Sequence, residues 1–250
     1  MNIKYQIFKI SKKNGKHRVI YSIDTITKKI LTSLLPTLQN IYDRNNVYNN
    51  NYGFIKGRNC VQNALSHIGY NFTLSMDIEN FFDSVSESHV KHIIPSAIIQ
   101  KCFIDGAPRQ GLPTSPIIAT IAFLKCDNLI IKRLKENNLK VVYTRYADDM
   151  TFSFNHKEDL QKIKFIVKQT IEEFNFKVNE KKTSMQDIKN GRIIITGIAV
   201  DKYGLYSTRK IKKKIRAAIH QNNLPSELGL REWAMCKLPN RTRNKDMKNG

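Results

Sequence analysis

The chain has few cysteines, and they lie far apart in the sequence. Only four occur among 250 residues, and no two of them form a CxxC pair. Such pairs are typical of zinc sites, and closely spaced cysteines are typical of small disulfide-stabilised domains. We therefore expect neither feature and interpret all four as reduced thiols. They are Cys60, Cys102, Cys126 and Cys236.

Long apolar runs are also missing. No stretch approaches the roughly 20 apolar residues that a membrane-spanning helix needs. The N-terminal residues lack the apolar core and the small-residue cleavage site of a secretory signal. The sequence therefore predicts a cytoplasmic protein with no membrane partner.

Acidic residues are scarce relative to basic ones. Asp and Glu number 21 against 42 Lys and Arg, which gives a net charge of +21, and the basic residues run from Lys4 to Lys248. A codon bias could add lysine without a function, but it does not explain a twofold excess over acids. Since 41% of the residues are hydrophobic, a folded core is available. We therefore expect a globular protein with a polyanionic partner, of which nucleic acid is the commonest.

Strand patterns and helical patterns follow one another along the sequence. Hairpins with central turns alternate with amphipathic helices. The expected order is a hairpin over 4–21, a helix over 25–38, an Asn-rich loop over 45–54, a helix over 60–68, a strand over 72–78, a helix over 115–134, a hairpin around 143–154, a helix over 158–174, a hairpin over 192–209 and a helix over 210–220. Because hairpins make antiparallel pairs, the predicted fold class is α+β, with a mainly antiparallel sheet and helices on one face.

Two of these elements also carry predictions of which side chains are buried. In the helix over 25–38, Ile26, Ile30 and Leu34 share one apolar face, and the helix is expected to end near Pro36. In the strand over 72–78, strict alternation places Asp77 on the polar face, at the end of the strand.

Asp148 and Asp149 stand side by side at the expected tip of a hairpin, where Asn-Gly or Asp-Gly is more usual. Adjacent carboxylates repel each other unless protons or a multivalent cation lie between them. Magnesium prefers oxygen ligands, and Asp77 at a strand end could supply a third carboxylate. Two Mg²⁺ ions roughly 3.5 to 4 Å apart would support in-line phosphoryl transfer, the chemistry of nucleotide polymerisation. Taken alone, however, an Asp-Asp pair is more often a solvated turn.

The pair belongs to one of four motifs whose order and spacing fit together. "YADD" at 146–149, "MDIENFF" at 76–82, "RQGLPTSP" at 109–116 and "NEKKTS" at 179–184 together resemble the motifs of reverse transcriptases. The resemblance implies a right-hand polymerase fold with an antiparallel palm sheet. It also implies an RNA-directed DNA polymerase, a nucleotidyltransferase that uses two Mg²⁺ ions.

Within that superfamily the chain looks most like a retron reverse transcriptase. Asn63-Ala64-x-x-His67 is similar to a retron signature, as are "ITGIAV" and the basic helix that follows it. The resemblance runs from about Lys12 to His220. It implies fingers over 1–72 with part of 84–108, a palm over 73–206 and a short basic thumb over 207–250. No second acidic cluster of the ribonuclease H type follows.

The resemblance also assigns roles to individual residues. Metal binding falls to Asp77, Asp148 and Asp149, with the backbone carbonyl of Ile78. Lys182 would protonate the leaving pyrophosphate or neutralise its charge. The nucleotide pocket would include Arg18, Lys16, Phe82, Gln110, Gly111, Tyr146 and Ala147. RNA binding would involve Asn63, His67, Arg209, Lys210, Lys212, Lys213, Lys214 and Arg216.

Simpler interpretations of some of these residues stay open. Phe82, expected to exclude a ribonucleotide 2′-OH, could be an ordinary core residue. Lys182 could be a surface lysine, and Arg18 could belong to a charged hairpin that faces water.

The retron resemblance implies partners as well. These are a structured non-coding RNA that is primed from a guanosine 2′-OH, its RNA–DNA hybrid product, dNTPs, and an effector protein in phage defence. Two rival interpretations are another bacterial reverse transcriptase, of the group II intron-like or diversity-generating kind, and a non-catalytic RNA-binding scaffold. The intact acidic triad disfavours the scaffold, because a decayed site should lose carboxylates that are costly without a cation.

Overall fold

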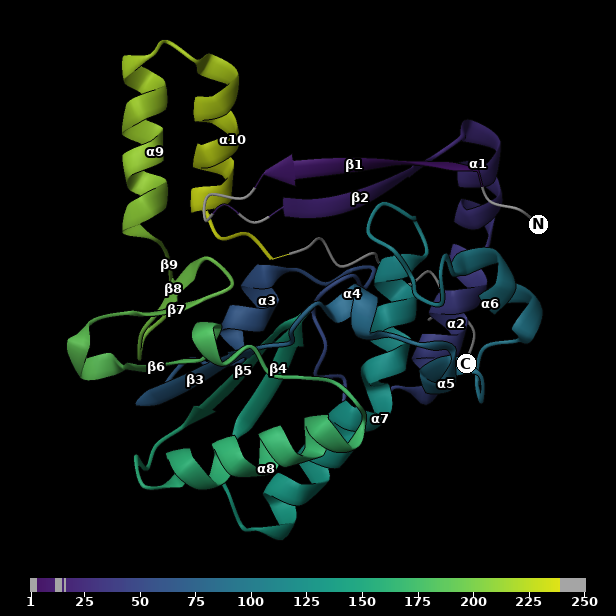
Figure 1. The fold of residues 1–250 in the computed structure, drawn as a ribbon. Helices are drawn as coiled ribbons and strands as arrows, with labels where there is room; N and C mark the ends of the chain where they lie inside the picture. The colour runs from purple at the N-terminus through teal and green to yellow at the C-terminus, as the bar shows by residue number, and fades with distance from the viewer. Residues whose placement is uncertain (1–3, 12–14, 16, 239–250) are drawn as a thin grey trace, which may run out of the picture. The chain divides into compact units, whose positions relative to one another are not determined.

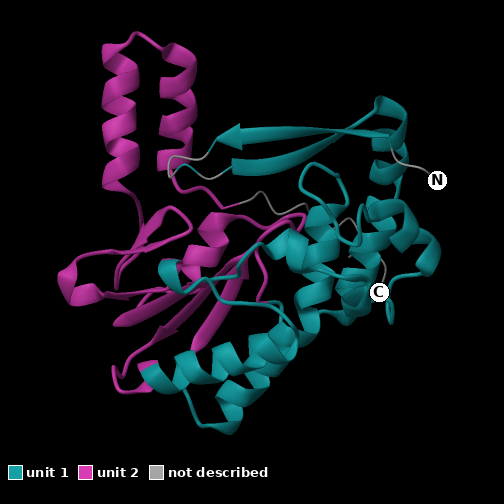
Figure 2. Ribbon diagram, viewed as in Figure 1, with its two compact units in different colours: residues 1–49, 77–139, 161–181 teal, residues 50–76, 140–160, 182–250 magenta. Residues whose placement is uncertain are grey.

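A computed structural model describes residues 4–11, 15 and 17–238 of the chain. It separates into two compact units, each assembled from three stretches of the sequence (Figure 2). Unit 1 comprises residues 1–49, 77–139 and 161–181, and unit 2 comprises residues 50–76, 140–160 and 182–250. These bounds differ from the expected limits of fingers, palm and thumb, which remain a prediction.

Unit 1 consists of one hairpin and a group of helices (Figure 1). Strands β1 and β2 pair antiparallel, from Tyr5 opposite Ile23 to Ser11 opposite His17. The elements are β1 (Tyr5–Ser11), β2 (His17–Ile23), α1 (Thr25–Ser33), α2 (Leu35–Asn45), α4 (Phe81–Ser84), α5 (Glu87–Val90), α6 (Ser96–Cys102), α7 (Ser115–Glu136), α8 (Asp159–Glu173, in this unit from residue 161) and the short 3-10 helix Glu180–Lys182, whose last residue falls in unit 2.

Helix α7 is the centre of unit 1, and α2, α4 and α5 pack on it. It begins with Pro116 in its first turn, where a missing N–H costs nothing. Its apolar residues are not confined to one stripe, and most of its side chains are buried, as in a core helix. Near its C-terminal end, Arg133 forms two hydrogen bonds of 2.8 Å to the carboxylate of Glu173, which ties α7 to α8.

The described residues of unit 2 form two antiparallel sheets, three α-helices and a 3-10 helix. The four-stranded sheet has the order β4-β5-β3-β6, and the three-stranded sheet has the order β7-β8-β9. The elements are α3 (Cys60–Leu65), β3 (Phe72–Asp77), β4 (Val142–Tyr146), β5 (Asp149–Phe154), β6 (Ser184–Asp187), a 3-10 helix (Ile188–Asn190), β7 (Ile193–Ile195), β8 (Ile198–Val200), β9 (Leu205–Ser207), α9 (Arg209–His220) and α10 (Leu224–Ala234). Helices α9 and α10 pack side by side (Figure 1).

The three-stranded sheet packs on α3 through a small apolar core. Cys60, Val61 and Ala64 of the helix meet isoleucine and valine side chains from β7 and β8. Tyr146, the last residue of β4, packs against the same cluster. Burial of these side chains joins α3, the sheet and the end of β4 into one body.

The expected α+β class with antiparallel strands is confirmed, while several local predictions were wrong. Pro36 does not end the helical region but starts the second helix, α2. On α1 the buried face holds Thr27 and Leu31, whereas Ile26 is 72% exposed. The expected hairpin over 192–209 has three strands, because the backbone turns once more at Thr196 and Gly197, both with positive φ.

The polar face of β3 is also buried rather than solvated. Thr73 is completely buried and the side chain of Asp77 is 4% exposed. Strict alternation locates the two faces of a strand, but it does not tell whether the polar one is covered. In the part of the chain that the structure describes, no helix is long and apolar enough to span a membrane.

Candidate polymerase site

The turn that carries the two adjacent acids is short and tightly held. Tyr146 of β4 pairs with Asp149 of β5, so Ala147 and Asp148 form the turn itself. Ala147 has a φ of 60°, a left-handed conformation that costs free energy for a residue with a side chain. The guanidinium of Arg145 donates a 3.0 Å hydrogen bond to the carbonyl oxygen of Ala147 and so stabilises this conformation.

Residues 50–53 run beside β4 and support the same turn. The backbone N–H of Arg145 donates to the carbonyl of Asn50 at 2.9 Å, and the N–H of Tyr52 donates to the carbonyl of Arg145 at 2.8 Å. Gly53 then passes so close that an added Cβ would lie 2.2 Å from the backbone nitrogen of Ala147. Only glycine permits that approach.

Sequence reasoning missed both Arg145 and Gly53. Arg145 is completely buried, which is rare for an arginine unless its hydrogen bonds are satisfied. Nothing in "YTRYADD" separates this residue from the many surface cations of the chain. Gly53 lies in an expected loop, where glycine is common, so the sequence did not indicate that its backbone passes close to the acidic turn.

Strand β3 ends at Asp77, and its neighbour β5 begins at Asp149. The hydroxyls of Thr73 and Ser153 lie 2.7 Å apart, and the rings of Phe72 and Phe154 stack with centroids 5.9 Å apart. Since residue 72 meets 154 and residue 73 meets 153, the two strands run antiparallel.

Main-chain contacts continue just beyond the end of β3. The carbonyl of Asp77 accepts a 2.8 Å hydrogen bond from the N–H of Asn179, and Ile78 forms an antiparallel bridge with Val178. The side chain of Ile78 is buried, so any contribution it makes to a metal site comes from its backbone, as expected from the sequence. Among the described residues, no three His, Cys, Asp or Glu side chains are grouped as a metal site.

His67 lies at the centre of a buried hydroxyl network. Its Nδ1 is 2.8 Å from the hydroxyl of Ser153, and its Nε2 is 2.6 Å from the hydroxyl of Thr144. The Ser153 hydroxyl also meets that of Thr73, so the ring bridges β4, β5 and β3. Burial lowers the pKa of His67 from 6.5 to about 3, because a charged ring would lose its hydration.

The retron signature therefore has a structural role in this fold. Asn63 is completely buried, and its Nδ2 donates to Thr196 Oγ1 at 3.4 Å, while the same hydroxyl donates to the carbonyl of Cys60 at 3.3 Å. With His67 only 1% exposed, the expected RNA contacts of these two side chains do not fit the structure. The signature instead joins α3 to the four-stranded sheet and to the β7–β8 turn.

The depressed pKa of His67 predicts a pH-dependent stability. Between about pH 6.5 and pH 3 the unfolded chain binds a proton at this residue that the folded chain does not. The free energy of unfolding should therefore fall on acidification below pH 6.5, by up to about 1.4 kcal/mol per pH unit from His67. Above that range its contribution is complete and constant.

Denaturant unfolding at several pH values would measure this effect. The His67→Gln variant should lose the corresponding part of the pH slope, whereas His156→Gln, which changes an exposed histidine, should keep it. Equal pH slopes in the His67→Gln variant and the wild type would contradict a neutral buried imidazole.

The loop with the "RQG" motif is attached to the β1–β2 hairpin. The N–H of Tyr21 donates a 2.7 Å hydrogen bond to the carbonyl of Gln110. Gly111 has a φ of +112°, and an added Cβ would lie 2.1 Å from the carbonyl oxygen of Tyr21. Arg109 holds the start of the loop through a 2.8 Å ion pair with Asp83. The half-buried side chain of Gln110 is therefore presented from a loop with little freedom.

The structure separates the roles of the two adjacent phenylalanines in α4. Phe81 is 4% exposed and packs edge-on against Phe123, with centroids 5.8 Å apart, and near Phe176. Phe82 is only half-buried. Its ring lies 5.9 Å from that of Phe81, centroid to centroid, so the role of Phe82 stays a prediction.

The remaining candidate cations lie at the surface. Arg18 is exposed on β2, opposite Ile10, and Lys182 is exposed at the end of its 3-10 helix. Lys16 lies outside the described residues.

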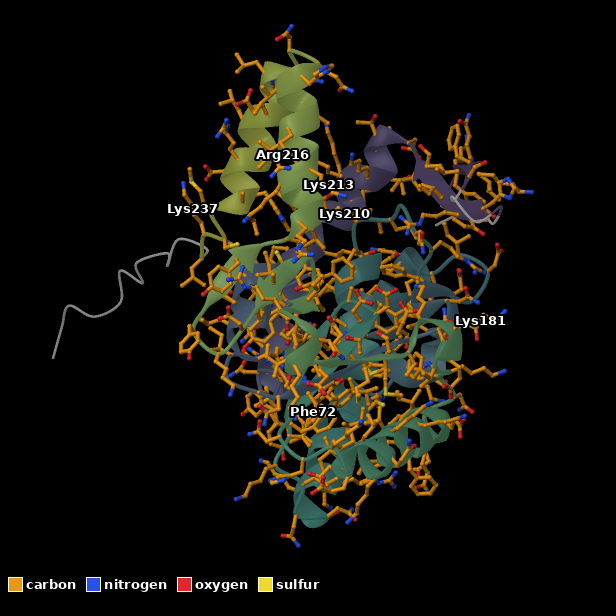
Figure 3. All side chains as sticks on the ribbon, turned by 90° about the vertical axis from the view of Figure 1, so that its left-hand side faces the viewer. Phe72, Lys181, Lys210, Lys213, Arg216 and Lys237 are labelled. Atoms are coloured by element: carbon orange, nitrogen blue, oxygen red, sulfur yellow. The ribbon has the colours of Figure 1, made fainter. Side chains whose placement is uncertain are left out.

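The charged residues of helix α9 are all basic. It carries six cations and no acidic residue. Lys210, Lys213 and Arg216 follow one another along it (Figure 3). An open groove of about 550 Å³ is lined by four of its cations and Ala217. The six are Arg209, Lys210, Lys212, Lys213, Lys214 and Arg216.

This charge arrangement is unfavourable for an isolated helix. Like charges four residues apart repel, as in the pair Lys210 and Lys214, and cations in the first turn oppose the helix dipole. Ile211 and Ile215 are half-buried, and Ala218 is buried, while Ile219 is 45% exposed. The helix thus keeps its apolar side inward and exposes a surface that an anion would stabilise.

Comparison with known proteins supports the same interpretation. The model of the family described as reverse transcriptase (RNA-dependent DNA polymerase) matches residues 10–212. The Retron Ec86 reverse transcriptase of Escherichia coli is 28% identical over 228 residues, which cover 88% of this chain and 70% of the relative. The Retron Mx65 reverse transcriptase of Myxococcus xanthus is 26% identical over 248 residues, covering 87% of this chain and 56% of the relative.

Solved structures share the fold at lower identity. The match to an apo telomerase from Candida tropicalis covers 82% of this chain and 55% of the telomerase chain, with a TM-score of 0.61 and 14% identity. A foamy viral protease-reverse transcriptase in complex with double-stranded DNA matches 92% of this chain and 36% of its own, with a TM-score of 0.57 and 18% identity. The expected right-hand polymerase fold is thereby confirmed. The chain belongs to the reverse transcriptase (RNA-dependent DNA polymerase) family and is an RNA-directed DNA polymerase of the retron type.

Proposed function

We propose that this chain reverse-transcribes a structured non-coding RNA into DNA, starting from the 2′-OH of a guanosine in that RNA. It remains bound to the RNA–DNA hybrid and acts in the cytoplasm with an effector protein in phage defence. The priming, the RNA and the defence role rest on the retron type of the chain.

The observation that supports the polymerase chemistry is the pairing of strands β3 and β5. Strands β3 and β5 are neighbours and run antiparallel, with Thr73 beside Ser153. The same register, continued by four residues along each strand, leads from Thr73 to Asp77 and from Ser153 to Asp149. Asp148 precedes Asp149 in the turn.

The donor atoms at these positions suit magnesium. Carboxylate oxygens are hard ligands, and a cation would relieve the repulsion between like charges. Asp77, Asp148 and Asp149 would hold two Mg²⁺ ions with the backbone carbonyl of Ile78. When bound, the ions would stabilise the attacking and leaving oxygens of nucleotidyl transfer.

The nucleotide pocket would draw on groups that the fold already holds in place. Gln110 and Gly111 are held against Tyr21 and would contact the incoming dNTP. Tyr146 and Ala147, at the acidic turn, are proposed as further nucleotide-binding residues. The resemblance adds Arg18 and Lys16 for the triphosphate and Lys182 for the leaving pyrophosphate. Cationic contacts suit this reaction, which depends mainly on positioning and on charge stabilisation.

Phe82 is proposed to select deoxyribonucleotides, because its half-buried ring would occupy the space of a 2′-OH. Phe82→Ala should therefore raise the rate of ribonucleotide incorporation relative to deoxyribonucleotide by about 10-fold or more, the effect of about 1.4 kcal/mol. Single-nucleotide extension with rUTP and dTTP would measure the ratio. Phe165→Ala, which removes an exposed ring on α8, serves as control. An unchanged ratio in Phe82→Ala would return Phe82 to a packing role.

Helix α9 is proposed to bind RNA phosphates through its exposed cations, because they have no acidic neighbours on the helix itself. Changing Lys212, Lys213 and Lys214 together to Gln should flatten the slope of log affinity against log salt by roughly two, at about 0.7 to 0.9 per phosphate contact. Binding measured at several salt concentrations gives this slope.

The matched control changes three exposed lysines elsewhere, Lys132, Lys157 and Lys162, to Gln. The net charge falls equally, but the slope should stay at the wild-type value. If both triple variants flatten the slope alike, binding follows net charge alone and α9 has no special role.

One experiment tests the proposed function as a whole. The protein is purified, the nucleic acid bound to it is sequenced, and DNA synthesis on an RNA template is measured with Mg²⁺. A structured RNA joined to short DNA would support the retron proposal. Synthesis accompanied by unrelated RNAs would favour another bacterial reverse transcriptase. Heterogeneous RNA without synthesis would favour a non-catalytic scaffold.

A further inference from the structure

The tip of the β8–β9 hairpin presents a bare aromatic ring. Tyr203 is 89% exposed, more than any other large apolar side chain in the described part of the chain. A tyrosine ring at a protein surface usually packs against other apolar groups. A ring that is almost fully exposed is therefore available for contact with another molecule.

The backbone at this tip is held rigidly. One carboxylate oxygen of Asp201 accepts hydrogen bonds from the N–H of Tyr203 at 2.8 Å and from that of Gly204 at 3.1 Å. The N–H of Asp201 donates to the carbonyl of Gly204 at 3.2 Å. The stem is anchored in turn, because Ile198 and Val200 of β8 belong to the buried cluster under α3.

A second flat group lies on the stem of the same hairpin. The guanidinium of Arg192 lies 3.5 Å from the centroid of the Tyr206 ring, and its Nε donates to Asp201 at 3.0 Å. Its side chain keeps 47% of its surface exposed. Guanidinium planes and aromatic rings are the surfaces on which proteins stack unpaired bases.

The electrostatic setting favours nucleic acid as the partner. Lys202 is exposed next to Tyr203, and Arg192 adds a second cation. Beyond the tip, β9 leads directly into the cationic helix α9. Thr208, just before α9, follows Gly204 by four residues, which span about 13 Å in an extended strand. An isolated ring among cations offers little area to a protein partner, whereas every base has a face that can stack.

We propose that Tyr203 is a stacking platform for an unpaired base of the nucleic acid strand that α9 binds, with Lys202 and Arg192 near the flanking phosphates. The inference rests on the proposed RNA binding and adds the chemical class that the hairpin recognises, a single-stranded nucleotide. Base-paired regions would not use this ring, since their bases are already stacked.

Equilibrium binding of two labelled probes tests the proposal. The probes are a short oligouridylate and a blunt RNA duplex of the same length, and an oligothymidylate shows whether the site distinguishes RNA from DNA. Tyr203→Ala should weaken single-strand binding by about 5- to 150-fold, the contribution of one stacked base. Tyr203→Phe should bind like the wild type, because it keeps the ring.

Two further results must accompany this loss. Duplex binding and the salt slope of Tyr203→Ala should be unchanged, since no charge is removed. Phe165→Ala, which removes another exposed ring on α8, should bind all probes normally. Wild-type affinity in Tyr203→Ala, equal losses on single strand and duplex, or a loss in Tyr203→Phe as large as in Tyr203→Ala would each overturn the proposal.

Extension of a paired primer-template separates this inference from the proposed function. With a template overhang of one nucleotide, synthesis by Tyr203→Ala should equal wild type, because the substrate offers the platform no unpaired base besides the one being copied. If the wild-type protein makes no DNA at all, the proposed function fails while the binding comparison still decides on Tyr203.

Discussion

Replacing Asp148 or Asp149 by asparagine is expected to abolish DNA synthesis while RNA binding persists. Asparagine keeps the size of the side chain and removes its charge, so the turn between β4 and β5 should survive. The proposed Mg²⁺ ions would contribute several kcal/mol of charge stabilisation in the transition state, and each 1.36 kcal/mol is a factor of ten. We therefore expect the rate of primer extension to fall by about 10³-fold or more.

The control for this prediction is Asp43→Asn, which changes an exposed aspartate on α2. It should extend the primer at the wild-type rate. Affinity for RNA, measured by filter binding, should be the same in all three variants, since the proposed role of the carboxylates is to hold metal rather than phosphate. Near wild-type synthesis in both site variants would refute the metal assignment.

Gly53→Ala is expected to cause the second largest loss. The added Cβ would lie 2.2 Å from the nitrogen of Ala147 and 2.9 Å from the carbonyl carbon of Tyr146. Both contacts are with backbone, which cannot rotate away, so the acidic turn must shift. A displacement of about 1 Å at a catalytic group can cost about 100-fold in rate. We expect a loss of that size in primer extension.

Gly229→Ala provides the matched control. It lies in α10 with no heavy atom within 4 Å of the added Cβ, so it should keep full activity and gain up to about 1 kcal/mol of stability. Far-UV circular dichroism and RNA binding would establish that Gly53→Ala still folds. Full activity in folded Gly53→Ala would mean that the close approach of residue 53 does not govern the turn.

Features that depend only on neighbouring residues could be predicted from the sequence. The two adjacent acids between strand patterns predicted a hairpin tip, and the structure has Ala147 and Asp148 in that turn. The helix expected over 158–174 was also predicted correctly, and its 3.6-residue period puts Ile163, Val167 and Ile171 on the buried side. In these cases neighbours along the chain determine the outcome, through the period of a helix or the pairing of a hairpin.

Burial that depends on distant segments could not be predicted. The polar face of β3 is covered because Ser153 meets Thr73 and is itself held by His67, and these residues come from three parts of the chain. The prediction of which face of α1 is buried was wrong for a similar reason. Packing against other elements buries Thr27 and Leu31 and leaves the more apolar Ile26 exposed. A sequence period indicates which residues share a face, but the neighbouring elements decide which face is covered.

The sequence by itself determined the family, the acidic motifs and the basic helix α9, because each depends on residue types at fixed spacing. Only the tertiary structure decided that Gly53 and Arg145 support the acidic turn and that the Asn63 and His67 side chains are internal. The physical reason is that a close approach or a buried hydrogen bond is a relation between segments far apart in the chain. Glycine, arginine, asparagine and histidine are common surface residues, so their types alone do not reveal such a relation.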